Sequence, residues 1–338
     1  MNGSDNIRGV SKAFDAWKDG FSSSVALVGE KGSGKSTLLS LLQEEVFKDS
    51  KVINLDIKQS TWKIEQILSL FGSAFDVTDV NRPENIVNAL NAREDKIVVN
   101  LEGLQKLYLR NINGFEALDA LWLIMSETKE KVFWITTCSR YAWEFLNKVE
   151  GVETHFTHVF WTDSLSDSNI ESVIMNRHVK SVYRLNFEAD ESTRKSRSYK
   201  KRLDDPKEVQ KYLKQVYFEN LSDLTEGNTS VASILWLRSI KKVEKRTITI
   251  SPFQPVNIET LEILKAETLF TLAAIVLHDT LKVAELCRVL NLTLAQSRVL
   301  LTRLKSRGVL IEQDGNYFLN QLVYRQVLRL LKRRNIIH

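Results

Sequence analysis

Residues 29–36 read G-E-K-G-S-G-K-S and fill every fixed position of the phosphate-binding motif G-x-x-x-x-G-K-S/T. The glycines allow backbone N–H groups to curl around phosphates, and the start of a following helix adds favourable partial charge. We expect Lys35 to reach the β- and γ-phosphates of a nucleoside triphosphate and the Ser36 hydroxyl to ligate Mg²⁺. The candidate nucleotide-binding residues are Gly29, Glu30, Lys31, Gly32, Ser33, Gly34, Lys35, Ser36 and Thr37.

The residues on either side of this loop supply the context that the motif needs. Residues 24–28 (S-V-A-L-V) predict a short apolar strand, and residues 37–42 (T-L-L-S-L-L) predict the start of an amphipathic helix. A strand, a glycine loop and a helix in this order predict binding of a nucleoside triphosphate. We expect ATP with Mg²⁺ rather than GTP, because the N-K-x-D element of guanine recognition is absent.

Strand and helix patterns alternate after the loop. Further strands are predicted at 51–57, 96–102, 131–137 and 159–161, and helices at 62–71, 115–125 and 141–149. Such alternation predicts a parallel sheet with crossover helices. The fold class is therefore α/β, with the parallel sheet of a P-loop NTPase in a first domain at 1–165.

The third predicted strand ends in N-L-E-G (100–103) and should supply the acid that holds Mg²⁺ through water. In one assignment Glu102 is this acid. In the other, Asn100 is the strand-end residue and Glu102 is the catalytic base. We favour the first, because an asparagine is a poor partner for Mg²⁺. An ordinary solvent-facing glutamate is the third alternative.

Composition excludes several classes of protein. The chain has 338 residues, 43% of them apolar and 26% charged, as is ordinary for a soluble globular protein. It has no apolar run of about 18 residues and begins without a basic and apolar leader, so we expect a cytoplasmic protein without a membrane span. Cys138 and Cys287 lie far apart and the five histidines are scattered, which argues against a zinc site.

The middle of the chain predicts a helical lid at 166–255. A helix is predicted at 166–177, and further helices at 206–224 and 231–240. Between them, six of the nine residues at 194–202 are basic and directly follow an acidic patch. This segment lacks periodicity and predicts an exposed, mobile insertion at about 190–205. It either contacts nucleic-acid phosphates or is a solvated loop neutralised by its acidic neighbour. Pro255 marks a linker.

The C-terminal part, 256–338, predicts a winged helix-turn-helix domain. Helices are predicted at 267–277, 282–290 and 294–307, followed by a hairpin at 309–319 around Asp314-Gly315 and a last helix at 321–334. This part holds 12 Lys and Arg against 7 Asp and Glu, which accounts for the whole net charge of +5. The third helix would enter a major groove. Its candidate DNA-binding residues are Gln296, Ser297, Arg298, Arg303, Lys305 and Arg307.

Together these motifs resemble the AAA+/STAND division of P-loop ATPases, in particular bacterial origin-recognition and transposition-regulator ATPases that carry a winged helix. The resemblance aligns Leu107 with a leucine that follows the acidic strand, which favours Glu102 as the metal-side acid. It also implies a sensor role near the γ-phosphate for the end of the fourth strand, T-T-C-S-R (136–140). Thr137, Ser139 and Arg140 are the candidates, with Ser139 and Arg140 preferred. Arg140 is equally consistent with a surface arginine at a helix start.

The chain departs from this family pattern in features that speed hydrolysis. Gly103 replaces the catalytic glutamate, no arginine finger stands between residues 141 and 162, and the lid segment 224–232 has no arginine. Arg93, Arg110 and Arg177 remain as unconventional fingers. One arginine finger contributes on the order of 10³-fold or more to the rate. Lys35, Glu102, Ser139 and Arg140, as catalytic residues, are therefore expected to support only slow ATP hydrolysis.

These observations predict an ATP-binding switch with ATP-dependent homo-oligomerisation, whose winged helix engages DNA. The alternative is a STAND-like signalling or defence regulator whose winged helix binds a partner protein. A metabolic kinase is disfavoured, because such an enzyme does not need a C-terminal winged helix.

Overall fold

The computed structural model describes residues 3–162, 167–179, 181–252 and 265–337. The described residues form two compact units. The first takes its residues from 1–163, 263–320 and 327–338, and the second from 164–262 and 321–326. The predicted domain boundaries at 165 and 255, and the linker at Pro255, lie outside the described residues. In the part of the chain that is described, no helix is long and apolar enough to span a membrane.

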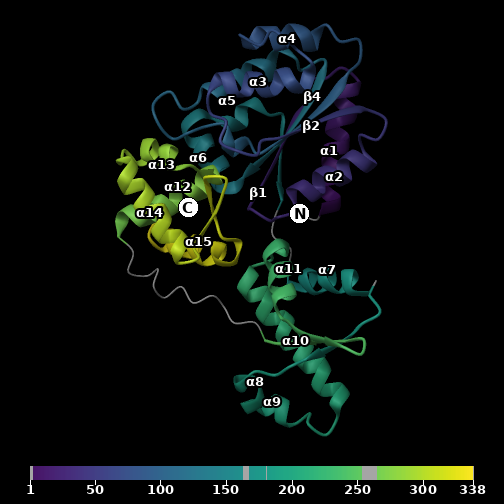
Figure 1. Ribbon diagram of the computed structural model, residues 1–338. Coiled ribbons are helices and arrows are strands. Elements are labelled where there is room, and N and C mark those ends of the chain that lie inside the picture. Colours follow the sequence, from purple (N-terminus) through teal and green to yellow (C-terminus); the bar gives the residue numbers. More distant parts are fainter. Residues whose placement is uncertain (1–2, 163–166, 180, 253–264, 338) are drawn as a thin grey trace. The chain divides into compact units, whose positions relative to one another are not determined.

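A five-stranded parallel sheet forms the centre of the first unit (Figure 1), as the sequence predicts. The strand order is β2-β3-β4-β1-β5. Every residue of β4 is buried, and so is nearly every residue of β1 and β3. Parallel strands that are covered on both faces read as continuous apolar runs, which is why the sequence revealed them. The strands are β1 Ser24–Gly29, β2 Lys51–Asp56, β3 Ile97–Glu102, β4 Val132–Ser139 and β5 His158–Thr162.

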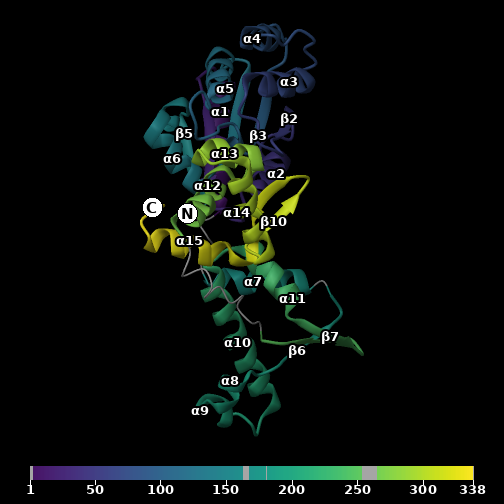
Figure 2. The ribbon, with the colours of Figure 1, turned by 60° about the vertical axis from the view of Figure 1, so that its left-hand side comes forward.

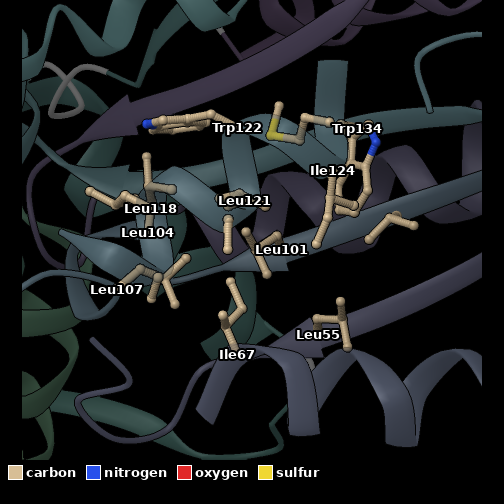
Figure 3. Close-up of a cluster of buried hydrophobic side chains, with 14 of the residues drawn as sticks. Leu55, Ile67, Leu101, Leu104, Leu107, Leu118, Leu121, Trp122, Ile124 and Trp134 are labelled. Atoms are coloured by element: carbon tan, nitrogen blue, oxygen red, sulfur yellow. The ribbon is translucent and has the colours of Figure 1, made fainter. Parts of the chain in front are cut away.

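Helices cover both faces of this sheet (Figures 1 and 2). Val25 and Leu27 pack with α1 (Gly3–Lys18) and α2 (Lys35–Glu45), whereas Ala26 and Val28 belong to the core on the opposite face. That second core contains side chains of α3 Ile64–Phe75, α4 Pro83–Asn91, α5 Glu116–Glu127 and α6 Arg140–Glu150. Figure 3 shows its centre, where Trp134 of β4 lies beside Ile124 of α5.

Two of these helices, α1 and α4, were not predicted from the sequence. Helix α1 contributes Phe14 and Trp17 to an aromatic cluster with Phe133 of β4, with ring centroids 5.3 and 5.6 Å from the Phe133 ring. The Trp17 indole N–H also donates a hydrogen bond of 2.8 Å to the Lys129 carbonyl. The helix is therefore a structural layer of the fold.

The sheet register brings the carboxyl ends of four strands together. Gly29 of β1 pairs with Ser139 of β4 and with Thr162 of β5, and Glu102 of β3 pairs with Thr137 of β4. Strand β4 therefore lies between the strand that precedes the phosphate loop and the strand that ends in the acid. Ligands of open parallel sheets bind at such carboxyl ends.

The first unit also contains the predicted winged-helix pattern. Helices α12 Ala266–His278, α13 Val283–Leu290 and α14 Leu294–Ser306 precede the hairpin of β10 Leu310–Gln313 and β11 Asn316–Leu319. Asp314 and Gly315 at the turn have positive φ, as a tight two-residue hairpin requires. A short strand, β9 (Thr280–Leu281), was not predicted and pairs with β11. After the hairpin, the chain continues through the 3₁₀ helix Gln321–Val323 into α15 (Tyr324–Arg333).

The second unit holds α7 Asp167–Val179, α10 Pro206–Thr225 and α11 Thr229–Arg238 with a sheet in the order β6-β8-β7. Its strands are β6 Arg184–Phe187, β7 Ile240–Glu244 and β8 Thr247–Ile250. The basic segment contains parts of two short helices that were not predicted, α8 Glu191–Lys195 and α9 Arg197–Lys200. Asp190 and Ser196 cap them by accepting hydrogen bonds from backbone N–H groups. Local caps, rather than apolar periodicity, therefore define these helices.

Candidate nucleotide-binding site

The phosphate loop adopts a conformation that only glycine accommodates at several positions. Gly32 and Gly34 have φ values of 82° and 91°, in the left-handed region, and Gly34 directly precedes α2. A Cβ atom on Gly29 would lie 1.9 Å from Thr162 Oγ1 and 2.6 Å from Ser33 Oγ. These two hydroxyl groups are themselves 2.7 Å apart. The glycine spacing of the motif therefore follows from backbone conformation and close packing.

Lys35 lies inside the loop. Its Nζ donates hydrogen bonds of 2.8 Å to the carbonyls of both Gly29 and Glu30. Burial is the main reason why the pKa of Lys35 is lowered to about 8, although the nearby Asp279 and Glu30 carboxylates raise it. Phosphate oxygens placed at this ammonium would offset the cost of its burial.

Ser36 and Glu102 meet beside the loop. The Ser36 hydroxyl donates a hydrogen bond of 2.6 Å to Glu102 Oε2. Asn100 instead donates to Asn54 Oδ1 at 2.8 Å and is buried in the sheet. Glu102, and not Asn100, therefore lies beside the Ser36 hydroxyl. Among the described residues, no three His, Cys, Asp or Glu side chains form a metal-binding group. The hydroxyl and the carboxylate nevertheless suit Mg²⁺, which keeps water and phosphate ligands.

The residue that follows the acid has no side chain and an unusual backbone. Gly103 has φ 97°, and its N–H donates a hydrogen bond of 3.1 Å to Thr137 Oγ1. Thr137 is therefore engaged in holding β3 against β4. Gln105 makes a second such link, because its Oε1 accepts a hydrogen bond of 3.1 Å from the Ser139 N–H. The sequence analysis missed Gln105, which no motif in the sequence marks.

Of the two preferred sensor candidates, Ser139 has the better placement. Its Oγ is buried and has no hydrogen-bond partner among the described residues, and Ser139 lies in register with Gly29. A buried hydroxyl beside the loop can hold a polar ligand atom. Arg140 is bound elsewhere: its Nε donates to Glu144 Oε1 at 2.9 Å, and its guanidinium lies 5.9 Å from the Trp161 ring. Arg140 thus resembles a surface arginine of α6.

The remaining loop residues contact neighbouring elements. Glu30 Oε1 accepts a hydrogen bond of 3.1 Å from the Tyr141 hydroxyl, and Lys31 Nζ lies 2.5 Å from Asp279 Oδ1. Thr37 is exposed on α2. Thr162, which packs against Gly29, was not among the predicted site residues; only its place at the end of the fifth strand could have indicated it.

The unconventional arginine fingers are distributed over the molecule. The Arg93 carbonyl accepts a hydrogen bond from Lys131, which directly precedes β4. Arg93 therefore lies at the amino ends of the strands, opposite to the edge that carries the phosphate loop. Arg177 belongs to the second unit and donates to Ser233. The Arg110 backbone N–H donates to His278.

One of the candidate DNA-binding residues of α14 does not lie on the surface of the helix. Ser297 is fully buried among the helices of the winged-helix domain, so its assignment as a DNA-contacting residue is corrected. Gln296 is exposed, but its Oε1 accepts hydrogen bonds of 2.9 Å from the N–H and the hydroxyl of Thr293 in a capping box. Lys305 is paired with Glu312 at 2.6 Å. The exposed arginines of this surface are Arg298, Arg303 and Arg307.

Comparisons with known proteins identify the fold. No family model and no curated protein matches the chain. The ORC2 protein of Aeropyrum pernix, solved as ADPNP-ADP complexes, superposes with a TM-score of 0.55 at 13% identity, covering 97% of this chain and 93% of that one. Cdc6p of Pyrobaculum aerophilum superposes with a TM-score of 0.51 at 12% identity, covering 98% and 94%. The chain shares the P-loop NTPase fold of these two proteins. In this fold, the phosphate loop, Glu102 and the end of β4 share one edge of the sheet.

Proposed function

We propose that this protein is an ATP-binding switch that hydrolyses ATP slowly. The observation that carries the proposal is the cluster at the carboxyl edge of the sheet, where Ser36 donates to Glu102 and Lys35 lies within the loop. The likeness in fold to a protein solved with ADPNP and ADP supports the choice of an adenine nucleotide.

Each residue of the cluster has a role that follows from its chemistry. The loop N–H groups and the Lys35 ammonium bind and orient the phosphates. Ser36 and Glu102 would hold Mg²⁺, which neutralises charge on the β- and γ-phosphates when it is bound. We assign to the buried Ser139 hydroxyl, which has no hydrogen-bond partner among the described residues, a hydrogen bond to the γ-phosphate or to the attacking water.

Slow hydrolysis follows from two features of the same edge. Gly103 offers no carboxylate to activate water, and Arg140 is held by Glu144 on α6. Two alternative fingers belong to residues 3–162. The Arg93 carbonyl accepts a hydrogen bond from Lys131 at the sheet edge opposite to the phosphate loop, and the Arg110 N–H donates one to His278 of the winged-helix domain. Transition-state charge on the γ-phosphate would then be stabilised mainly by Lys35 and Mg²⁺.

We expect a single-turnover rate well below about one per second for the wild-type protein with Mg²⁺-ATP, because P-loop ATPases without an arginine finger are slowed on the order of 10³-fold or more. Quenched-flow measurement of phosphate release from radiolabelled ATP, with the protein in excess, gives this rate. A rate of several per second for the purified chain would contradict the assignment as a slow switch.

We further propose that the winged-helix domain binds duplex DNA through α14. Arg298, Arg303 and Arg307 support this, since they are exposed on one helix and its end in the part of the chain that carries the net positive charge. The alternative is a signalling regulator whose winged helix binds a protein, and salt-independent absence of DNA binding would favour it.

ATP-dependent self-assembly stays a prediction from the sequence, which light scattering with and without a non-hydrolysable ATP analogue tests.

Replacing Arg298, Arg303 and Arg307 together by alanine is expected to weaken DNA binding and to lower the salt slope. Each lost phosphate contact removes about 0.9 from the slope of log K against log salt concentration, or about 2.7 for three. Fluorescence anisotropy of a labelled duplex at several salt concentrations measures both. Alanine at the exposed Lys12, Lys48 and Lys148 removes the same charge elsewhere and serves as the control. Equal losses in both variants would show that only net charge matters.

A further inference from the structure

The winged-helix domain places a carboxylate directly at the phosphate loop. Helix α12 ends at His278, and Asp279 follows it with φ 64°. Asp279 Oδ1 lies 2.5 Å from the Nζ of Lys31, which is a residue of the loop. Its Oδ2 lies 3.8 Å from the Nζ of Lys106, four residues after Glu102. One acidic side chain of the appended domain thus bridges two cations at the nucleotide site.

Buried contacts next to Asp279 hold it in this position. The Tyr108 hydroxyl donates a hydrogen bond of 3.0 Å to the Leu277 carbonyl, and the Arg110 N–H donates one of 3.0 Å to His278 Nε2. The rings of Tyr108 and His278 lie 4.7 Å apart. Tyr108 and His278 are both almost completely buried. The ion pair is therefore one part of a packed junction between α12 and the segment 104–110.

The carboxylate of Asp279 is charged at neutral pH. Burial raises its pKa, but the ammonium groups of Lys31, Lys106 and Lys35 outweigh burial and leave the pKa below its ordinary value. The negative charge of Asp279 also acts on Lys35, because it raises the pKa of that lysine. Asp279 therefore holds a negative charge close to the lysines that a triphosphate needs for its own phosphates.

We propose that Asp279 sets the nucleotide affinity of this site: its carboxylate competes with the phosphates of the nucleotide for Lys31. Binding of the triphosphate and docking of α12 on the loop then oppose each other. Nucleotide binding weakens the junction, and the docked winged helix weakens nucleotide binding, by the same factor. The inference rests on the proposed binding of ATP and assigns to Asp279 a role that the loop motif does not contain.

The variant Asp279→Asn is expected to bind Mg²⁺-ATP about tenfold more tightly than the wild type, because it removes the negative charge that competes with the phosphates for Lys31. Isothermal titration calorimetry with the full chain gives the two Kd values. Asp314→Asn removes an exposed acid of the same domain at the hairpin turn and should leave the Kd unchanged. An unchanged or weaker affinity in Asp279→Asn overturns the proposal.

A double-mutant cycle identifies the route of the effect. In the Lys31→Met background, Asp279→Asn should change the Kd by less than about threefold, since the cation for which both anions compete is gone. A full tenfold gain in that background would overturn the competition for Lys31.

Hydrogen exchange on the wild-type chain tests the same coupling without any variant. Addition of Mg²⁺-ATP should speed exchange of the Arg110 amide, whose acceptor is His278 of α12. Unchanged or slower exchange at Arg110, in samples where calorimetry shows that ATP is bound, overturns the proposal. If the wild type binds no ATP at all, the proposed function fails instead, so the two failures are distinguishable.

Discussion

Replacement of Lys35 by alanine is expected to weaken Mg²⁺-ATP binding by about 100-fold, or about 2.7 kcal/mol. Hydrogen bonds to charged groups contribute about 1.5–3 kcal/mol each, and Lys35 is the loop cation of the motif. Its ammonium already lies at the carbonyls of Gly29 and Glu30, so little rearrangement is needed to reach phosphates. Calorimetric titration of the variant and the wild type measures the difference.

The charge state of Lys35 gives this prediction a pH dependence. Burial lowers its pKa to about 8, so the ammonium is present below pH 8 and is lost as the pH rises above it. The wild-type affinity should therefore fall between pH 7 and pH 9, whereas the residual affinity of Lys35→Ala should not follow this profile. Lys48→Ala, at an exposed position of the same domain, is the control. Comparable loss of affinity in the two lysine variants would contradict a specific role for Lys35.

Acid is expected to destabilise the junction between α12 and segment 104–110, through His278. Its Nδ1 donates to the Ala274 carbonyl at 2.8 Å and its Nε2 accepts from the Arg110 N–H, so the imidazole must be neutral. Burial lowers the pKa of His278 to about 4 from the ordinary 6.5. The unfolded state therefore binds more protons between these values, and stability falls as the pH drops from 6.5 to 4. The full loss is about 3 kcal/mol.

Native-state hydrogen exchange of the α12 amides, corrected for intrinsic rates, measures this loss at pH 7 and at pH 4.5. In His278→Gln most of the pH dependence should disappear, although the junction itself is weaker. His158→Gln removes an exposed histidine and should behave like the wild type. The raised pKa of buried Glu285 acts in the opposite direction in all three proteins and so does not affect the comparison. An equal pH dependence in wild type and His278→Gln would refute the assignment.

The sequence predicted the central sheet because its signals are local. Strands that are covered on both faces, such as β3 and β4, are runs of apolar residues. The loop has glycines where its backbone adopts positive φ. Helix α1 escaped prediction because it contains Gly3 and Gly9 and several polar residues of low helix propensity. Packing of Phe14 and Trp17 against the sheet stabilises it instead.

The site was predictable only where it follows the motif. Lys35, Ser36 and Glu102 could be named from the loop and from the strand that ends in an acid. The links made by Gln105 and Thr137 depend on β4 lying between β1 and β3, which no local pattern encodes. The position of Asp279 depends on how the winged-helix domain packs against the loop.

The left-handed backbone at Gly103 limits how a water-activating carboxylate could be introduced next to Glu102. A glutamate introduced there would carry its side chain on a backbone that costs L-residues roughly 1–2 kcal/mol. Space is not the obstacle, because its Cβ would make an ordinary contact of 3.4 Å with the Ile57 carbonyl oxygen. Under the proposed slow hydrolysis, a water-activating carboxylate at this position would therefore require two coupled changes, one in chemistry and one in the chain path.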